Sequence, residues 1–124
     1  MTKFMASFNG KQLTALTELF NDFRIFIPEV VEQTVIALFS CKLKAPLTVH
    51  NTRTLCYIFH CMSLEFLITP IWQAVAEQHA CFVSLKGKSI SRNTLSSAKY
   101  CAVKSEIIDS WTIEEYISRL KRLK

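Results

Sequence analysis

Cysteine and histidine side chains near the middle of the chain are the residue types that could bind a metal ion. Cys56 and His60 are four positions apart, so they share one face of a helix, and Cys61 follows directly. A structural zinc site needs four ligands, usually in two paired clusters. The remaining candidates are single residues in separate segments, namely Cys41, His79, Cys81 and Cys101. Because cysteine is among the residue types most often buried, we predict that these side chains pack in the core and that no metal ion is bound.

A cysteine beside a histidine could also act as a nucleophile, and the sequence offers Cys81 with His60 or His79. Catalytic thiols lie in electropositive, partly exposed surroundings, whereas these residues lie in apolar segments without the local signature of a known cysteine enzyme. The chain has no G-x-S-x-G sequence for a serine nucleophile, and its two glycines, Gly10 and Gly87, are too isolated to form a phosphate-binding loop. We therefore predict a protein that is not an enzyme and that uses neither a cofactor nor a small-molecule substrate.

A stretch of basic residues without any acidic residue favours a binding function. The formal net charge is +5, and all of it comes from residues 78–124, because residues 1–77 contain six basic and six acidic side chains. No acidic residue lies between Glu77 and Glu106. Arg92 and Lys99 are seven positions apart, which places them on one face of a helix with Ser96 between them.

Basic and hydroxyl side chains at this spacing can bind phosphate groups and release counterions, and the amides at the start of the helix can add to the site. The alternative, that these lysines only keep an apolar protein soluble, stays open at this point. A second basic cluster near the C-terminus contains Arg119 and Arg122. Cations in the last turn of a helix also complement the helix dipole, so this cluster can be explained without a ligand. The predicted nucleic-acid-binding residues are Lys86, Lys88, Arg92, Ser96, Lys99, Lys104, Arg119 and Arg122.

The composition predicts one compact domain with apolar surface to spare. The chain has 124 residues, of which 50% are hydrophobic and 20% charged, and its mean hydropathy is +0.22. Such a surplus favours a homo-oligomer or a surface for a protein partner. No apolar run reaches the roughly 18 residues of a membrane span, and the first residues do not form a signal peptide. Five cysteines without a C-x-x-C pair indicate reduced thiols. We expect an intracellular protein without membrane association, in the cytoplasm or the nucleus.

The elements that position these residues are predicted to be helices, because apolar side chains recur every three or four residues along most of the chain. Pro28 and the pair Thr69-Pro70 open helices, and Thr112 with Glu115 forms a capping box for the last one. Gly87 suits a left-handed helix end. The β-branched run 30–36 would also suit a buried strand, but its length favours a helix. The prediction is an all-α single-domain bundle of about six helices over residues 1–124, with a mobile lead-in at 1–10 and helices at 11–26, 28–43, 52–67, 70–86, 94–107 and 112–123.

Two functions follow as expectations. The first is a self-associating helical protein whose basic face binds nucleic acid, RNA or DNA, in a nucleocapsid-like or RNA-binding accessory role. A small, basic, cysteine-rich and glycine-poor chain would suit a virus-encoded protein. The alternative is a helical adaptor or inhibitor that binds a partner protein's helix in a hydrophobic groove. Charge reversal at Arg92 and Lys99 should abolish binding in the first case and leave it unchanged in the second.

Overall fold

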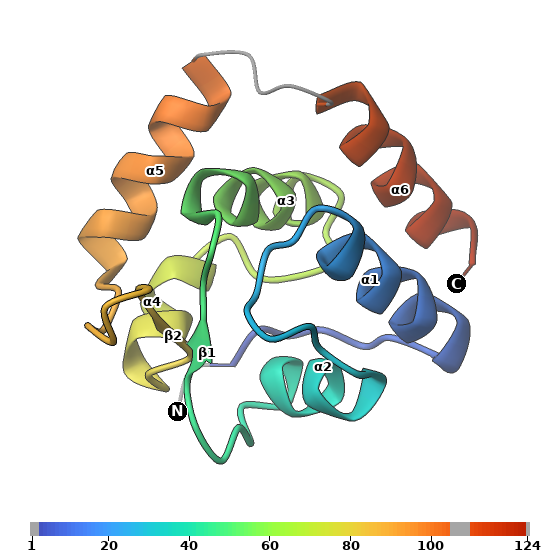
Figure 1. Cartoon of the computed structure of the whole chain (residues 1–124). Coiled ribbons are helices and arrows are strands. Elements are labelled where there is room, and N and C mark those ends of the chain that lie inside the picture. The colour runs from blue at the N-terminus through green and yellow to red at the C-terminus, as the bar shows by residue number, and fades with distance from the viewer. Residues whose placement is uncertain (1–2, 105–109, 124) are drawn as a thin grey trace.

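The described part of the chain forms six helices that share one hydrophobic core, and Figure 1 shows their arrangement in the computed structural model. The structure describes residues 3–104 and 110–123. The helices of this part of the chain are α1 (Gly10–Asp22), α2 (Glu32–Phe39), α3 (Thr52–Leu64), α4 (Trp72–Gln78), α5 (Arg92–Lys104) and α6 (Ser110–Arg122), and its strands are β1 (Leu47–Thr48) and β2 (Phe82–Val83). The predicted fold class, an all-α single domain of six helices, is confirmed.

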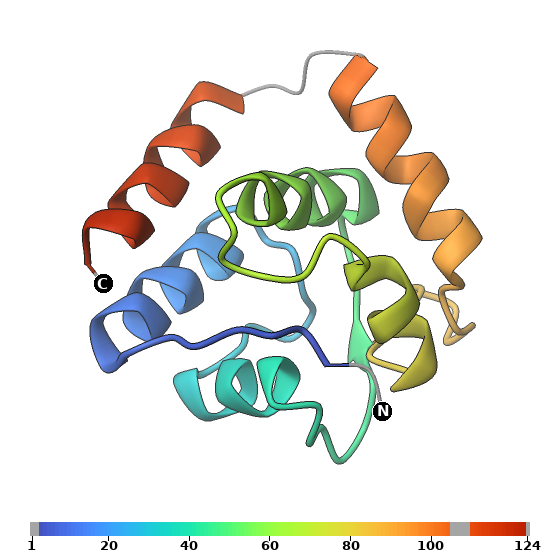
Figure 2. The same cartoon turned by 180° about the vertical axis from the view of Figure 1, so that it is seen from behind.

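Helix α3 is the centre of the bundle. Figures 1 and 2 show α5 and α6 on opposite flanks of α3, while α1, α2 and α4 lie below it. The ring of Phe59 on α3 is completely buried, and its centroid lies 5.3 Å from that of Trp72 and 5.7 Å from that of Phe39. Three more rings pack around Phe59, those of Phe4, Phe20 and Phe82. Burial of these large side chains supplies much of the driving force for folding.

A small sheet joins segments that the periodicity had assigned to a loop and to the end of a helix. Strands β1 and β2 are parallel, with Leu47 opposite Phe82 and Thr48 opposite Val83. Phe26 extends the sheet through an antiparallel bridge to Val49. The predicted helix 70–86 is therefore wrong over its last eight residues, because α4 spans only Trp72–Gln78 and Phe82 and Val83 pair with β1.

Helices α1 to α4 end in the same way, and this explains why they are shorter than predicted. Each is followed by a non-glycine residue with a left-handed backbone, and these are Arg24, Cys41, Phe66 and Ala80, with φ values of 50°, 58°, 59° and 48°. At each end, the next residue's amide reaches back five residues to a helical carbonyl, as from Leu67 to Met62 (2.9 Å) and from Cys81 to Ala76 (3.0 Å). This is the Schellman arrangement, which glycine usually forms.

The second helix begins at Glu32 and not at Pro28, because the preceding residues are fixed in another way. The Asn21 side chain donates to the carbonyl of Val30 (2.9 Å) and accepts from its amide (3.0 Å). The peptide bond between Ile27 and Pro28 is cis. Both polar groups of Val30 are thus bound to α1, so the segment before Glu32 is extended.

The N-terminal segment is part of the core, in contrast to the predicted mobile lead-in. Phe4 is completely buried, and its carbonyl accepts a 2.7 Å hydrogen bond from the amide of Thr69. Asn9 and Gln12 form a capping box at the start of α1. Gln12 is also completely buried and donates to the carbonyl of Leu120 (2.8 Å), while Asn9 donates to that of Leu123 (2.7 Å). The start of α1 therefore binds the unpaired carbonyls at the end of α6.

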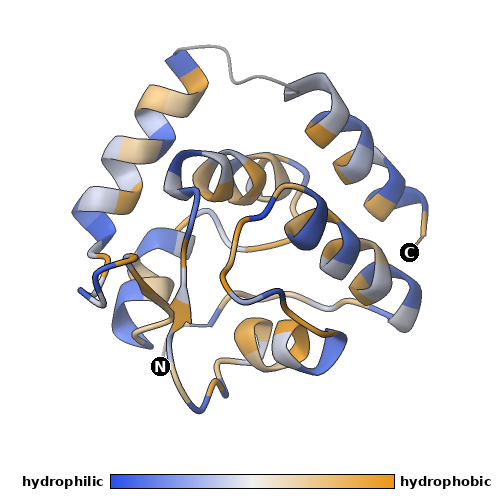
Figure 3. Ribbon diagram, in the orientation of Figure 1, coloured by the Kyte–Doolittle hydropathy of each residue, from blue (hydrophilic) through white to orange (hydrophobic). Residues whose placement is uncertain are grey.

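The last two helices follow the prediction closely. Helix α5 begins at Arg92, two residues before the predicted start, and residues 105–107 of the predicted helix lie outside the described part of the chain. Helix α6 begins at Ser110, so Thr112 lies inside its first turn and not at its cap. Figure 3 shows that the apolar residues of α6 face the bundle and that its outer side is hydrophilic. Among the described residues, no helix is long and apolar enough to cross a membrane.

Candidate nucleic-acid interface

Helix α5 exposes most of its surface, unlike the central helix that it packs against. Nine of its thirteen residues are exposed, and only Leu95 and Ala102 are buried. Ala98 and Lys99 are half-buried on the same side, toward α3 and α4. No exposed residue of α5 is acidic. The free side of α5 thus carries no negative charge and can contact an anionic ligand.

The outermost line of α5 lies opposite Leu95 and Ala102. It consists of residues spaced by four, three and four positions, which are Asn93, Ser97, Tyr100 and Lys104. The Lys104 ammonium lies 3.3 Å from the Tyr100 hydroxyl and 5.3 Å from the centroid of its ring. These contacts place a cation and an aromatic ring together at the C-terminal half of the helix.

The loop before α5 presents two lysines on a tight turn. Gly87 has a φ of 80°, and its amide donates to the carbonyl of Ser84 (2.8 Å). The Ser84 hydroxyl accepts from the amides of Lys86 (3.3 Å) and Lys88 (3.2 Å), and both lysines are exposed. Gly87 therefore has the predicted left-handed backbone, but it serves this turn and not the end of a helix. The turn holds Lys86 and Lys88 next to the N-terminus of α5.

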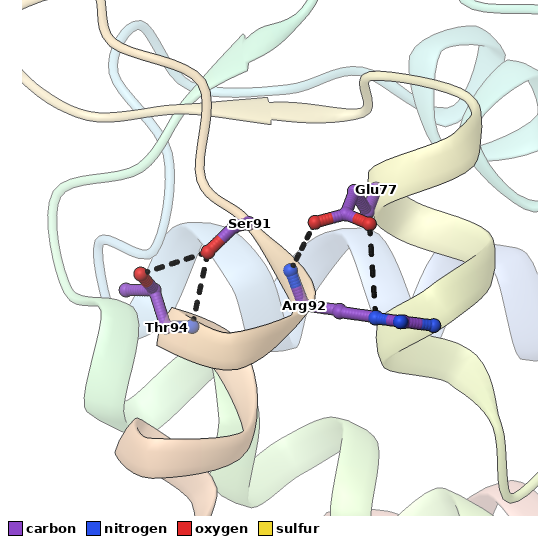
Figure 4. A network of polar contacts seen from close by, with 4 residues as sticks. All are labelled: Glu77, Ser91, Arg92 and Thr94. Atoms are coloured by element: carbon purple, nitrogen blue, oxygen red, sulfur yellow. Dashed lines mark hydrogen bonds and ion pairs between the residues drawn. The ribbon is translucent and has the colours of Figure 1, made fainter.

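The N-terminus of α5 is already occupied by an acidic side chain (Figure 4). The Glu77 carboxylate of α4 accepts from the Arg92 amide (2.9 Å) and lies 3.9 Å from its guanidinium. The amide of Thr94 donates to the Ser91 hydroxyl (3.2 Å). Two of the amides at the start of the helix, those of Arg92 and Thr94, thus have partners within the protein. Because Glu77 neutralises Arg92, this arginine fixes α5 on α4 and adds little positive charge to the surface.

Lys99 lies against α3. Burial raises the pKa of the Cys56 thiol to about 12, although the nearby charge of Lys99 acts to lower it. Burial also lowers the pKa of His60, and Lys99 lowers it further. Both effects place the Lys99 ammonium beside α3. Arg92 and Lys99 do share one face of α5, as the spacing predicted, but Lys99 is half-buried toward α3, and Arg92, although exposed, is paired with Glu77 of α4.

The C-terminal cations lie on the other flank of α3. Arg119 and Arg122 line a hollow of about 360 Å³ on α6 together with Glu115 and Tyr116. The Tyr116 hydroxyl donates to a carboxylate oxygen of Asp22 on α1 (2.7 Å). Figures 1 and 2 show α3 between α5 and α6. The two basic clusters therefore do not form one groove.

Three of the five cysteines, Cys56, Cys61 and Cys81, are buried as predicted, whereas Cys41 is half-buried and Cys101 is exposed, so the core prediction is wrong for Cys101. All five are free, and burial raises the pKa of Cys61 to about 11 and that of Cys81 to about 12. Such thiols stay protonated near neutral pH, which makes them poor nucleophiles and poor metal ligands. Within residues 3–104 and 110–123, no three acidic, histidine or cysteine side chains are grouped so that they could hold a metal ion.

Three uncharged residues on the free side of α5 were not among the predicted binding residues, whereas Ser96 was. Asn93, Ser97 and Tyr100 follow from the helical spacing once Leu95 and Ala102 define the buried side. Val103 is 52% exposed, although its neighbour Ala102 is buried. No family model, no curated protein and no solved structure matches the chain.

Proposed function

We propose that the protein is not an enzyme and that it binds nucleic acid through the free side of α5 and the turn before it. This α5 surface consists of Lys86, Lys88, Asn93, Ser96, Ser97, Tyr100 and Lys104. The observation that carries the proposal is the absence of any acidic side chain among the nine exposed residues of α5. If the charged residues of α5 only kept the protein soluble, acidic residues would serve that purpose as well as basic ones.

The side chains of the α5 surface are suited to phosphate and sugar contacts. Lysine, serine, asparagine and tyrosine all donate to phosphate oxygens. The helix has thirteen residues, and at a rise of about 1.5 Å per residue it is about 20 Å long. Lys86 and Lys88 lie at one end and Lys104 at the other, so the cations can contact phosphates on both sides of a bound segment. Four predicted residues are left out of the proposed surface. Arg92 is paired with Glu77, Lys99 is half-buried toward α3, and Arg119 and Arg122 lie on α6.

A pair of charge reversals tests this proposal. The variant Lys88→Glu/Lys104→Glu changes the α5 surface, and the control Arg119→Glu/Arg122→Glu makes the same change of net charge on α6. We expect the first variant to bind fluorescent oligonucleotides at least about tenfold more weakly near 100 mM salt, measured by anisotropy. The control should lose less than about twofold, through the long-range field alone.

The salt dependence gives a second readout of the same surface. Each lysine that contacts a phosphate contributes about one unit to the slope of log affinity against log salt concentration. Lys88→Ala and Lys104→Ala should therefore each lower the slope by about one unit. Equal losses in the α5 and α6 variants would mean that only the net charge matters, and this result would contradict the proposal.

The second candidate, binding of a partner protein's helix, is supported by apolar side chains near the end of α3. Phe66 is 90% exposed and Leu64 is 62% exposed. Leu64 also lines a hollow of about 220 Å³ between α3 and α6, with Cys61 and Ile117. The same residues could serve self-association. Light scattering on Phe66→Ser tests this, because a dimer that depends on this end of α3 would dissociate, whereas nucleic-acid binding by one chain would be unchanged. Either function fits an intracellular protein with reduced thiols.

A further inference from the structure

We infer that the nucleic acid is double-stranded DNA and that α5 lies in its major groove. This inference rests on the proposed function and names its ligand. The α5 surface has lysines at its two ends, and between them it has three small polar side chains and Tyr100. The lysines would bind phosphates, while the central residues would face the base edges in the groove. The geometry of this helix fits the major groove of B-form DNA better than the alternatives.

The first argument is the shape of the exposed helix. A helix with its side chains is about 10–12 Å across, and the major groove of B-form DNA is about 12 Å wide. Only a helix that is free over more than half of its circumference can enter. Helix α5 meets this condition, because its packing contacts lie on the side of Leu95 and Ala102. Ser96 and Ser97 are small, so the backbone can come close to the base edges.

The second argument is the type of side chain on the outermost line. Asparagine forms a pair of hydrogen bonds with adenine, serine can contact any base, and lysine binds guanine or a phosphate. Asn93 and Lys104 are eleven residues apart, which is about 16 Å along the helix. With base pairs about 3.4 Å apart, the line spans about five of them. Asn93 lies in the first turn, which is the part of a recognition helix that contacts bases in helix-turn-helix proteins.

The third argument concerns the charge around the N-terminus of α5. An unpaired carboxylate at this position would repel the phosphate backbone. Glu77 is paired with Arg92 through both of its oxygen atoms. The pair contributes no net charge, so Lys86 and Lys88 determine the local potential. The turn that carries them lies close to the start of α5 in Figure 1, where a strand of the duplex would pass.

The other nucleic acids fit less well. Proteins that bind single strands stack successive bases on several aromatic side chains. The α5 surface has one aromatic residue, Tyr100, and Lys104 already lies over its ring at 5.3 Å. In double-stranded RNA, the major groove is too narrow and deep for side chains to read. The chemistry of α5 therefore favours double-stranded DNA.

The test first compares the affinity of the protein for three nucleic acids and then examines one predicted base contact. The full chain is titrated into duplex DNA, duplex RNA and single-stranded DNA, each about 20 nucleotides long with a random centre, in the same salt. We expect duplex DNA to bind at least about tenfold more tightly than the other two probes. Selection from the random duplexes then gives a preferred sequence.

Substitutions at Asn93 and Ser97, on the outermost line of α5, distinguish sequence-specific base contacts from electrostatic attraction to the phosphates. Asn93→Ala should weaken binding to the selected duplex about tenfold and leave binding to random duplexes and the salt slope nearly unchanged. Ser97→Leu should weaken both by blocking the approach of α5, whereas the matched change Ser118→Leu on α6 should not. Both serines are exposed.

The failures of the two proposals look different. If duplex RNA or single-stranded DNA binds as tightly as duplex DNA, and Lys88→Glu/Lys104→Glu weakens all three, the α5 surface binds nucleic acid but the inference about DNA is overturned. Duplex binding that is insensitive to Asn93→Ala and Ser97→Leu would also overturn it. If no probe binds at any salt concentration, both the inference and the proposed function fail.

Discussion

Glycine in place of Phe66 or Ala80 should make the protein more stable. Both residues have a left-handed backbone directly after a helix, with φ values of 59° and 48°. This conformation costs an L-residue about 1–2 kcal/mol, and glycine does not bear that cost. Glycine loses more backbone freedom on folding, which offsets about 0.5–1 kcal/mol. The expected net gain is about 0.5–1 kcal/mol for each substitution.

Neither substitution removes much packing. The Phe66 side chain is 90% exposed, so its loss exposes almost no core, and Ala80 is exposed as well. The two residues follow different helices and share no hydrogen bond, since Phe66 donates to Ser63 and Ala80 to Glu77. Their effects should therefore add to about 1–2 kcal/mol in the double variant.

Urea unfolding followed by far-ultraviolet circular dichroism measures the change, and Ala74→Gly is the matched control. Ala74 lies inside α4, where the backbone is right-handed and glycine relieves no strain. This control should lose about 1 kcal/mol. Ala80→Gly and Ala74→Gly are the same chemical change near the same helix, yet they should shift the midpoint in opposite directions. If Ala80→Gly destabilises the protein as much as Ala74→Gly does, the account of the helix ends is refuted.

Three further predictions concern the core. Gln12→Ala should cost about 2–3 kcal/mol in urea unfolding, because it leaves the Leu120 carbonyl without its donor in a buried place. At pH 8, a thiol reagent should modify exposed Cys101 quickly and buried Cys56 only on unfolding. The pKa of Cys56 is raised from 9.0 to about 12, so its contribution to stability is complete below pH 9 and is lost as the pH rises toward 12. Unfolding midpoints measured between pH 8 and about 11 should therefore fall.

The sequence predicted the number and order of the helices, because apolar periodicity is a local signal. It did not predict where helices α1 to α4 end. Their left-handed positions are occupied by residues such as Arg24 and Phe66, which carry no signal of their own. At the ends of α1, α3 and α4 the next residue is buried in the core, and these residues are Ile25, Leu67 and Cys81. Tertiary packing therefore accounts for these three helix ends, whereas Lys42 after α2 is exposed.

Contacts between distant segments account for the other differences. Leu47 pairs with Phe82 across 35 positions, and Phe4 meets Thr69 across 65. Hydrophobic periodicity does not predict contacts between residues so far apart in the sequence. The candidate site was affected in the same way, because one of its contacts joins distant residues. The sequence identified a stretch without acidic residues, but it could not show that Glu77, fifteen positions before Arg92, would neutralise that arginine.

The contrast between α5 and α6 is the strongest reason to place function on α5. Both helices have thirteen residues and flank α3. The polar side chains of α6 are used to hold the fold: Glu114 accepts from Tyr57 (3.0 Å), Tyr116 donates to Asp22 (2.7 Å) and Lys121 pairs with Glu65 (2.8 Å).

Among the described residues, helix α5 has fewer such ties to the bundle. Arg92 binds Glu77 of α4, Thr94 bonds Ser91 directly before the helix, and Lys104 and Tyr100 contact each other on the outer side of α5. Side chains that stabilise no other element are poorly explained by folding alone. If α5 were only a cover for α3, replacing Asn93, Ser97 and Lys104 together by alanine would leave both stability and every binding property unchanged. We expect the stability to stay within about 0.5 kcal/mol, as for surface substitutions in general, while binding to duplex DNA is lost.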